Sequence, residues 1–409
     1  MIAKWLKQAA TERPDHCALR ILGSQESQSF AQLKTNVDTA ALKLLEKGIA
    51  PGQPTPVVME RSIAAVVHLL AVFSVNAVPV LGEQPHSKHV VEPSKGAFVV
   101  VHTSGSTGDP VPIFLSESQV EASVAGSADR LGVDSSDAWL CVLPLDHVGG
   151  LSILFRAICA GTTVVLGPQS FQPRVVSEAL QRGEVTQISL VPTQLKRLIP
   201  FFEVRGPSER VRFMLVGGAA TGAELLSACG RLGLPVARTW GMTECASQVA
   251  TAFPGVLSGP VPVLLGVEVT RDSETGRLRV WGDIAPGGSF LTRDLGQVSR
   301  EGVLLEGRVD DIVISGGENL SLGRIQQALE KHPFIAEAAV IVRPDSVWGE
   351  RPVAICVSLS DTPPTLDSVR EFLLGQGFRD REIPDALQWV EALPRNELGK
   401  LSKGLLHWK

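Results

Sequence analysis

The chain has 409 residues, of which 44% are hydrophobic and 20% charged, with a formal net charge of −5 at pH 7. This length predicts two or three domains, and the composition is that of a folded α/β protein, which excludes disordered and fibrous classes. The slightly acidic balance does not favour a nucleic acid or an anionic membrane as a partner.

The cysteines and the apolar segments indicate the cellular compartment of the protein. The six cysteines are scattered singly, so neither a disulfide scaffold nor a zinc site is indicated, and we expect a cytoplasmic protein. Residues 1–20 carry charges among their apolar residues and lack the continuous apolar stretch of a signal peptide. Residues 63–81 are the most apolar, but His68, Asn76 and Pro79 interrupt them, which predicts a buried helix and strand and no membrane span.

Helical and strand-like segments alternate through the first half of the chain. Apolar residues recur at helical spacing over 30–47, and the glycines and proline of 48–52 end that pattern. Short apolar runs that predict buried strands follow at 55–59, 97–102, 139–143, 162–166, 187–191 and 211–216. Most are separated by stretches long enough for helices, so we predict a layered α/β domain with largely parallel sheets.

The pattern changes in the last third of the chain. After about residue 260, shorter strands at 278–281 and 303–306 predict a β-rich subdomain, and a boundary is expected near Asp310. The segments that follow predict a strand and a glycine turn, a helix at 322–331, strands at 338–343 and 353–359, a helix at 366–376 and a basic tail. We therefore expect a domain over 1–309 and a compact α+β domain over 310–409.

The strand at 97–102 runs directly into a loop of small and hydroxyl residues, Thr103, Ser104, Gly105, Ser106, Thr107 and Gly108. Small side chains let the backbone approach a phosphate closely, and successive amides form a positive concavity. The alternative is a solvated linker. The loop lacks the Gly-Lys-Ser/Thr ending of a Walker motif, so it is not a P-loop of that type.

A second cluster combines Trp240, Gly241, Thr243 and Glu244 after the apolar segment 234–237. These groups could stack a base, contact a phosphate and hold Mg²⁺. The alternative is a core tryptophan beside a helix-capping threonine.

Three further positions offer polar groups that are each weak evidence alone. Asp294 follows a strand-like segment and suits the hydroxyls of a ribose, although a lone surface aspartate is the commoner explanation. Residues 307–319 surround a short β-branched run with polar groups and a glycine pair, which could be only a turn, a strand and another turn. Lys400 follows a glycine turn, where a lysine is usually only a solvated charge.

Taken in order, these motifs resemble the adenylate-forming superfamily, which includes acyl-CoA synthetases, firefly luciferase and the adenylation domains of peptide synthetases. The resemblance extends from about residue 20 to the end. Five segments are most similar to o-succinylbenzoate-CoA ligases, namely 143–150, 189–195, 217–220, 292–294 and 315–319. The resemblance implies a large N-terminal α/β domain with a β-rich subdomain and a small mobile C-terminal domain. The implied partners are a small carboxylic acid, ATP with Mg²⁺, and coenzyme A.

The resemblance also implies residue roles around ATP. Residues Thr103 to Gly108 would hold the β- and γ-phosphates, Thr243 would contact the α-phosphate, and Glu244 would bind Mg²⁺. Trp240 would stack on adenine. The segment Gly218, Ala219 and Ala220 would border the adenine and acid pockets, with His147 and Gly241 also on the acid side.

Further along the chain, Asp294 and Arg308 would take the ribose hydroxyls. Lys400 would bridge the carboxylate and the α-phosphate, where a fixed cation offsets crowded negative charge. Asp310 would be the hinge of the mobile domain. Gly316 and Gly317 would line the path of coenzyme A.

The sequence departs from the family pattern where Val111 replaces a lysine after the phosphate loop and where Trp240 replaces a tyrosine. Two alternatives therefore stay open: another aryl- or acyl-CoA ligase, and a catalytically silent nucleotide-binding relative. Both a monomer and a homo-oligomer fit the sequence.

Overall fold

The computed structural model describes residues 1–82, 96–104, 110–315, 318–346, 348–395, 401, 405, 406 and 408, and leaves six side chains within these ranges undescribed. The chain divides into two compact units. The first unit comprises Met1–Thr221, Leu225–Glu268 and Val280–Phe290, and the second comprises Gly222–Glu224, Val269–Arg279 and Leu291–Lys409. The predicted domain boundary at Asp310 stays a prediction.

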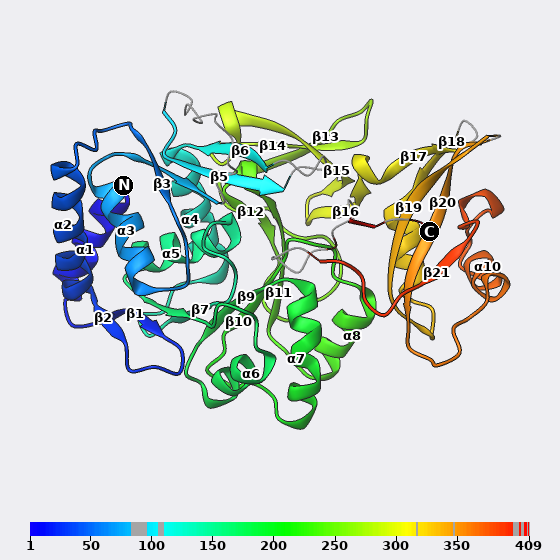
Figure 1. Ribbon diagram of the computed structural model, residues 1–409, viewed down its shortest axis with the longest axis horizontal. Coiled ribbons are helices and arrows are strands. Elements are labelled where there is room, and N and C mark those ends of the chain that lie inside the picture. The colour runs from blue at the N-terminus through cyan, green and yellow to red at the C-terminus, as the bar shows by residue number, and fades with distance from the viewer. Residues whose placement is uncertain are drawn as a thin grey trace. The chain divides into compact units, whose positions relative to one another are not determined.

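An eight-stranded sheet forms the centre of the first unit (Figure 1). In spatial order its strands are β12 (Ser247–Thr251), β11 (Val236–Met242), β10 (Phe213–Val216), β9 (Gln187–Leu190), β7 (Ala138–Cys141), β8 (Thr163–Leu166), β1 (Cys17–Ile21) and β2 (Ser27–Ser29). Only the outermost pairs, β11 with β12 and β1 with β2, are antiparallel. The six strands from β11 to β1 pair in parallel, which confirms the predicted class.

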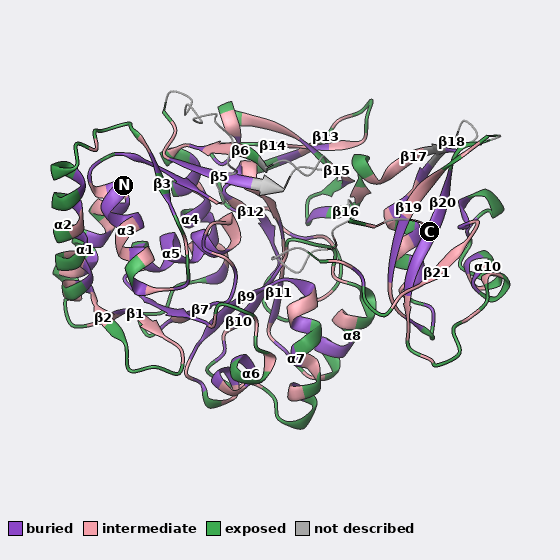
Figure 2. Cartoon of the chain, viewed as in Figure 1, coloured by how far each residue is buried: buried purple, intermediate pink, exposed green. Residues whose placement is uncertain are grey.

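Helices cover both faces of this sheet. Along β7, Trp139 and Cys141 join one apolar core while Leu140 joins the other, because strand side chains alternate between faces. One core contains α1 (Ile2–Glu12), α2 (Phe30–Glu46), α3 (Ile63–Ser74), α4 (Glu117–Leu131) and α5 (Val148–Ala160). The other contains α6 (Pro173–Arg182), α7 (Pro192–Val204) and α8 (Ala223–Arg231). Every residue of β8, β9 and β10 is buried (Figure 2), which explains why these strands appear in the sequence as short, mostly apolar runs.

The structure also contains two four-stranded sheets. The first unit also holds β3 (Pro54–Val57), β4 (Val78–Leu81), β5 (Val99–Ser104) and β6 (Pro110–Leu115) in that order. A second four-stranded sheet runs β13 (Glu268–Arg271), β14 (Arg277–Trp281), β15 (Ser289–Ser299) and β16 (Gly302–Arg308), with a 3-10 turn η2 (Pro286–Gly288) before β15. The predicted strands at 278–281 and 303–306 are confirmed. The prediction that Asp294 follows a strand is wrong, since it lies within β15.

The C-terminal part of the second unit is an α+β fold, as expected. Its sheet has the order β18 (Glu318–Ser321), β17 (Ile312–Ser315), β20 (Gly349–Ser358) and β19 (Ile335–Asp345), and β21 (Leu387–Trp389) pairs with β20. The helices are α9 (Leu322–Leu329) and α10 (Leu366–Gly375), with 3-10 turns η3 (Val309–Asp311) and η4 (Asp380–Glu382). Apolar residues of both helices pack with Val340 and Cys356 in one core.

Candidate active site

Several predicted site residues follow the carboxyl ends of neighbouring parallel strands. The strands β7, β9, β10 and β11 are adjacent and parallel, so their carboxyl ends lie along one edge of the sheet. His147 lies in the segment after β7, and Gly218 to Ala220 follow β10. Gly241 lies at the end of β11, and Thr243 and Glu244 follow it. Open α/β sheets bind ligands at this edge. The fold therefore brings the predicted adenine, phosphate and acid residues of the first unit to one side of the sheet.

Gly241 occupies a position where no other residue fits. The register between β11 and β12 shifts between Trp240 and Gly241, which marks a bulge. A Cβ atom added at Gly241 would lie 1.7 Å from the carbonyl oxygen of Ser247. That oxygen belongs to the paired strand and cannot move aside alone, so the bulge requires glycine and sets the exit of the chain toward Thr243.

The segment after β11 turns sharply through a 3-10 helix, η1 (Thr243–Cys245). Ala246 and Ser247, which follow it, have φ angles of 50° and 110°, an uncommon conformation for residues with side chains. Surrounding hydrogen bonds hold this turn. The buried Gln119 donates from Nε2 to the carbonyl oxygens of Glu244 at 2.8 Å and Ile284 at 3.1 Å, and Ser123 Oγ donates to the carbonyl of Ala246 at 2.8 Å.

Half-buried Thr243 and Glu244 are thus presented on a fixed backbone. The neighbouring Cys245 is fully buried, and burial raises the pKa of its thiol to about 12. A thiol with that pKa stays protonated at neutral pH and is not a nucleophile. The reactive groups available in this turn are therefore the hydroxyl of Thr243 and the carboxylate of Glu244.

Trp240 lies deeper than its predicted role suggests. Its residue is only 6% exposed, and it belongs to β11 opposite Ala250. This burial favours the interpretation as a core tryptophan, and stacking on adenine stays a prediction.

Arg156 is a residue that the sequence analysis did not single out. It is the single charged residue of helix α5 and is buried, and burial lowers the pKa of its guanidinium to about 9, so it stays protonated at neutral pH. Its Nη2 lies 3.3 Å from the hydroxyl of Ser247, directly after the Thr243 turn, and its guanidinium lies 5.5 Å from the ring of Trp139. Its Nε has no hydrogen-bond partner among the residues that the structure describes. The sequence signal that could have identified Arg156 is a single charged residue within a largely apolar helical segment.

The predicted ribose residues form a charged cluster within the second unit. Asp294 on β15 and Arg308 on β16 are directly opposite each other, and Arg308 Nη1 lies 3.1 Å from Asp294 Oδ1. Asp294 is mostly buried, with its side chain 13% exposed, while that of Arg308 is 50% exposed. Asp310, the predicted hinge residue, lies in η3 directly after β16. The antiparallel register is what brings Asp294 and Arg308 together across 14 residues of sequence.

Other predicted residues lie wholly or partly outside the description. Gly105 to Gly108, Gly316, Gly317 and Lys400 lie outside the described residues, as do the side chains of Thr103 and Ser104, whose backbones end β5. Their roles stay predictions. Val111, which replaces the expected lysine, is an exposed residue on β6.

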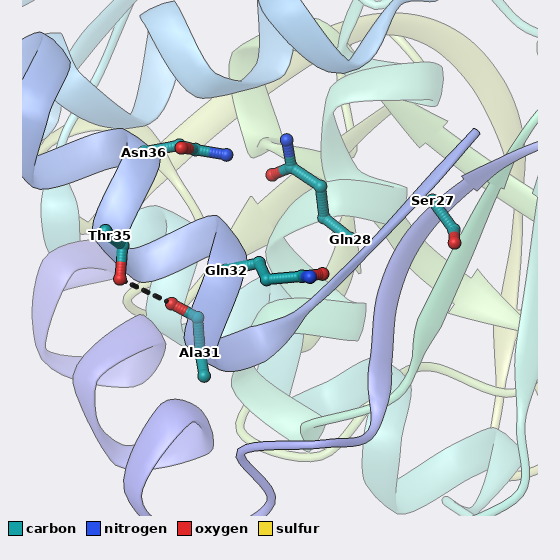
Figure 3. A pocket seen from close by; sticks show the side chains of 6 residues that line it. All are labelled: Ser27, Gln28, Ala31, Gln32, Thr35 and Asn36. Carbon is teal, nitrogen blue, oxygen red and sulfur yellow. Dashed lines mark hydrogen bonds between the residues drawn. The ribbon is translucent and has the colours of Figure 1, made fainter.

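A hollow of about 510 Å³ lies between β2 and α2 (Figure 3). It is lined by Ser27, Gln28, Ala31, Gln32, Thr35 and Asn36. All are uncharged, and Thr35 donates its hydroxyl to the carbonyl of Ala31 at 3.0 Å. The hollow therefore offers no group suited to neutralise a phosphate or a carboxylate.

Among the described residues, no three His, Cys, Asp or Glu side chains gather closely enough to hold a metal ion. None of the described helices is both long and apolar enough to cross a membrane.

Comparison with known proteins agrees with this geometry and assigns the chain to the class of adenylate-forming enzymes. A model of AMP-binding enzymes matches residues 6–83 and 81–280, and a model of the AMP-binding enzyme C-terminal domain matches residues 324–400. The chain belongs to the AMP-binding enzyme family.

Relatives with a curated name show which enzymes of this family the chain is similar to. The chain is 29% identical to the 2-succinylbenzoate–CoA ligase of Bacillus cytotoxicus, with 97% of this chain and 96% of that protein covered. It is also 29% identical to the ligase of the same name from Bacillus anthracis, with the same coverage.

Solved structures give the same result. The o-succinylbenzoate CoA synthetase of Bacillus subtilis in complex with its acyl-adenylate intermediate is 26% identical, with a TM-score of 0.85 over 98% of this chain and 97% of that chain. The same enzyme in complex with ATP and magnesium ion is 26% identical, with a TM-score of 0.86 over 98% of both chains.

Proposed function

We propose that this protein is an ATP-dependent acid–thiol ligase that converts o-succinylbenzoate to its coenzyme A thioester through an acyl-adenylate. In the first half-reaction a carboxylate oxygen of the acid attacks the α-phosphorus of ATP, and pyrophosphate leaves. In the second the thiol of coenzyme A attacks the acyl carbonyl carbon, and AMP leaves. The thioester and AMP are the products.

The observation that carries the proposal is the set of predicted site residues that follow the carboxyl ends of β7, β10 and β11, in a chain of the AMP-binding enzyme family. Adenylation asks the protein mainly to position two anions and to neutralise their charge. The Thr243 hydroxyl would donate to an α-phosphate oxygen. Asp294 and Arg308 would bind the ribose hydroxyls, and Lys400 would approach the reacting carboxylate.

Glu244 suits Mg²⁺, which is usually held by one or two carboxylates together with substrate phosphates and waters. Bound there, the ion would neutralise charge on the phosphates. A single carboxylate on a turn held by Gln119 fits that arrangement better than a dedicated metal cage. Glu244 therefore needs the nucleotide to complete the metal site.

The position of Arg156 favours a substrate with two carboxylates. One carboxylate of o-succinylbenzoate becomes the acyl-adenylate, and the other keeps its charge. A buried anion is costly unless a cation meets it. Arg156 is a buried cation beside Ser247, and the Nε of Arg156 has no hydrogen-bond partner in the described part of the chain. We infer that Arg156 meets the second carboxylate and favours this acid over monocarboxylic acids.

The test is a thioester assay with ATP, Mg²⁺ and coenzyme A across o-succinylbenzoate, benzoate and fatty acids. We expect o-succinylbenzoyl-CoA and AMP from the first acid and little product from the others. Thioester from the monocarboxylic acids with none from o-succinylbenzoate would show another acyl- or aryl-CoA ligase. Absence of pyrophosphate–ATP exchange with every acid would show a silent relative.

The Arg156→Met variant tests the acid pocket. Removing one member of a buried charge pair costs about 2 kcal/mol or more, so kcat/KM for o-succinylbenzoate should fall about 30-fold or more, while ATP binding stays unchanged. The matched control is Arg130→Met, because Arg130 also lies over an aromatic ring, that of Phe253, and donates to a backbone carbonyl, that of Val263. An equal loss in both variants would refute the assignment of Arg156.

A further inference from the structure

Four charged residues near the end of the β15–β16 hairpin form a chain of alternating sign. Arg308 donates from Nη1 to Asp294 Oδ1 at 3.1 Å and from Nη2 to Asp310 Oδ2 at 3.4 Å. Arg293 then donates from Nη1 to both oxygens of Asp310, at 3.2 Å and 3.3 Å. The order of contacts is therefore Asp294, Arg308, Asp310, Arg293. All four residues belong to the second unit.

Local structure explains how residues distant in sequence come into this order. Asp294 and Arg308 are direct cross-strand partners, so their contact follows from the register of the hairpin. The 3-10 turn η3 (Val309–Asp311) begins as soon as β16 ends, and Asp310 in it lies within reach of the Arg308 guanidinium. Arg293 precedes Asp294 on β15 and reaches the same Asp310 carboxylate.

We propose that Arg293 is a positioning residue for nucleotide binding, which holds Asp310 so that Arg308 and Asp294 keep the geometry that the ribose requires. This inference rests on the proposed function, in which Asp294 and Arg308 bind the ribose hydroxyls. Arg293 itself need not touch the nucleotide. Its effect passes through the Asp310 carboxylate, both oxygens of which accept hydrogen bonds from it.

Charge balance gives the physical reason. Two arginines and two aspartates make the cluster neutral. Without Arg293, Asp310 has only Arg308 among the cluster's cations, and it competes with Asp294 for the same guanidinium. The cluster also acquires a charge of −1 close to where a polyanionic nucleotide binds, within the roughly 8–10 Å over which charges act at moderate salt. Both effects weaken nucleotide binding and neither removes a reacting group.

Exposure sets the size of the effect. The side chain of Arg293 is 59% exposed and that of Asp310 is 39% exposed, so water screens their attraction. We expect the Arg293→Ala variant to raise the KM for ATP and the Kd for AMP about two- to fivefold, with kcat nearly unchanged. The Arg293→Lys variant keeps the positive charge and should recover most of the loss.

The matched control is Arg300→Ala, which removes the same charge from the turn of the same hairpin, where Arg300 is exposed. It should leave the KM for ATP within about 1.5-fold of the wild-type value, because exposed charges more than a Debye length away are largely screened. Equal effects of Arg293→Ala and Arg300→Ala would show that only net charge matters, which would overturn the proposal.

A double-mutant cycle with Asp310→Asn tests whether Arg293 acts through Asp310. Kd for AMP, measured by calorimetry, should rise when Arg293→Ala is made in the wild-type chain and should rise less in the Asp310→Asn background, where only the loss of a positive charge remains. Fully additive effects would refute action through Asp310. Calorimetry needs no acid substrate, so failure of the thioester assay would refute the proposed function and leave this test intact.

Discussion

The turn that follows β11 and the charged cluster at the end of the β15–β16 hairpin both carry predicted nucleotide-binding residues, and their surroundings differ. Around the turn, Gly241 has no room for a Cβ atom and Gln119 is buried, with 4% exposure. In the cluster, the side chains of Arg293 and Arg308 are 59% and 50% exposed. The first is held by close packing and buried hydrogen bonds, and the second by charges in contact with water.

This difference suits the tasks proposed for the two regions. A hydroxyl and a carboxylate that are to meet the reacting phosphate and its metal ion need a fixed geometry, which buried contacts provide without reorganisation. Residues near a predicted hinge need contacts that form and break at low cost, and exposed ion pairs contribute only about 0–1 kcal/mol each. Substitutions at the turn should therefore be costly and insensitive to salt, and those in the cluster should be mild and salt-dependent.

The largest effect is expected from Gly241→Ala. The new Cβ would overlap the Ser247 carbonyl oxygen, and relief requires separating β11 from β12. We expect the free energy of unfolding to fall by about 3 kcal/mol or more, measured by denaturant titration.

The control for this substitution is Gly206→Ala, since a Cβ at Gly206 meets no atom of the described residues within 4 Å. It should change stability by no more than about 0.5 kcal/mol. If Gly241→Ala were equally mild, the turn would not be held by packing as described.

An intermediate effect is expected from Gln119→Met. This change removes the hydrogen bonds to the carbonyls of Glu244 and Ile284 and also the bond from the Ser116 N–H to Gln119 Oε1 at the start of α4. Leaving buried carbonyls unsatisfied costs about 1–3 kcal/mol. Thermal unfolding should detect this loss, and kcat should fall because Glu244 loses its backbone anchor.

Gln32→Met isolates the contribution of the two carbonyls. Gln32 makes the same capping contact at the start of α2, where its Oε1 accepts from the Ser29 N–H at 2.9 Å, but it is exposed. The difference between the two variants reports the bonds to the turn. A difference near zero would mean that Gln119 acts only as a helix cap.

Much of the fold was predictable from the sequence because its strands are buried on both faces. The runs at 187–191 and 211–216 are mostly apolar, broken only by Gln187, Ser189 and Arg212, and they correspond to β9 (Gln187–Leu190) and β10 (Phe213–Val216). The strand β15 escaped prediction around Asp294 because it carries exposed polar residues and a register shift between Leu295 and Gly296, which hide the alternation.

The site was predictable in part for a similar reason. Thr243 and Glu244 stand out as polar residues after an apolar segment, whereas the support from Gln119 comes from 125 residues earlier in the chain. No local pattern marks such a contact. Arg293 shows the same limit, because its partner Asp310 lies 17 residues away and is brought near only by the hairpin register and the η3 turn.

The smallest effect is expected from Arg308→Gln on stability, and its salt dependence sharpens the comparison. This variant loses the pairs with Asp294 and Asp310. The free energy of unfolding should fall by about 1 kcal/mol at low ionic strength and by much less near 1 M salt, where the Debye length is about 3 Å. The loss caused by Gly241→Ala should stay constant over the same range, because steric overlap is not screened.

Denaturant titrations at both salt concentrations measure both quantities, with Arg300→Gln as the control for net charge. A salt-independent loss at Arg308 would mean that its contacts act as buried ones, and the contrast between the turn and the cluster would fail.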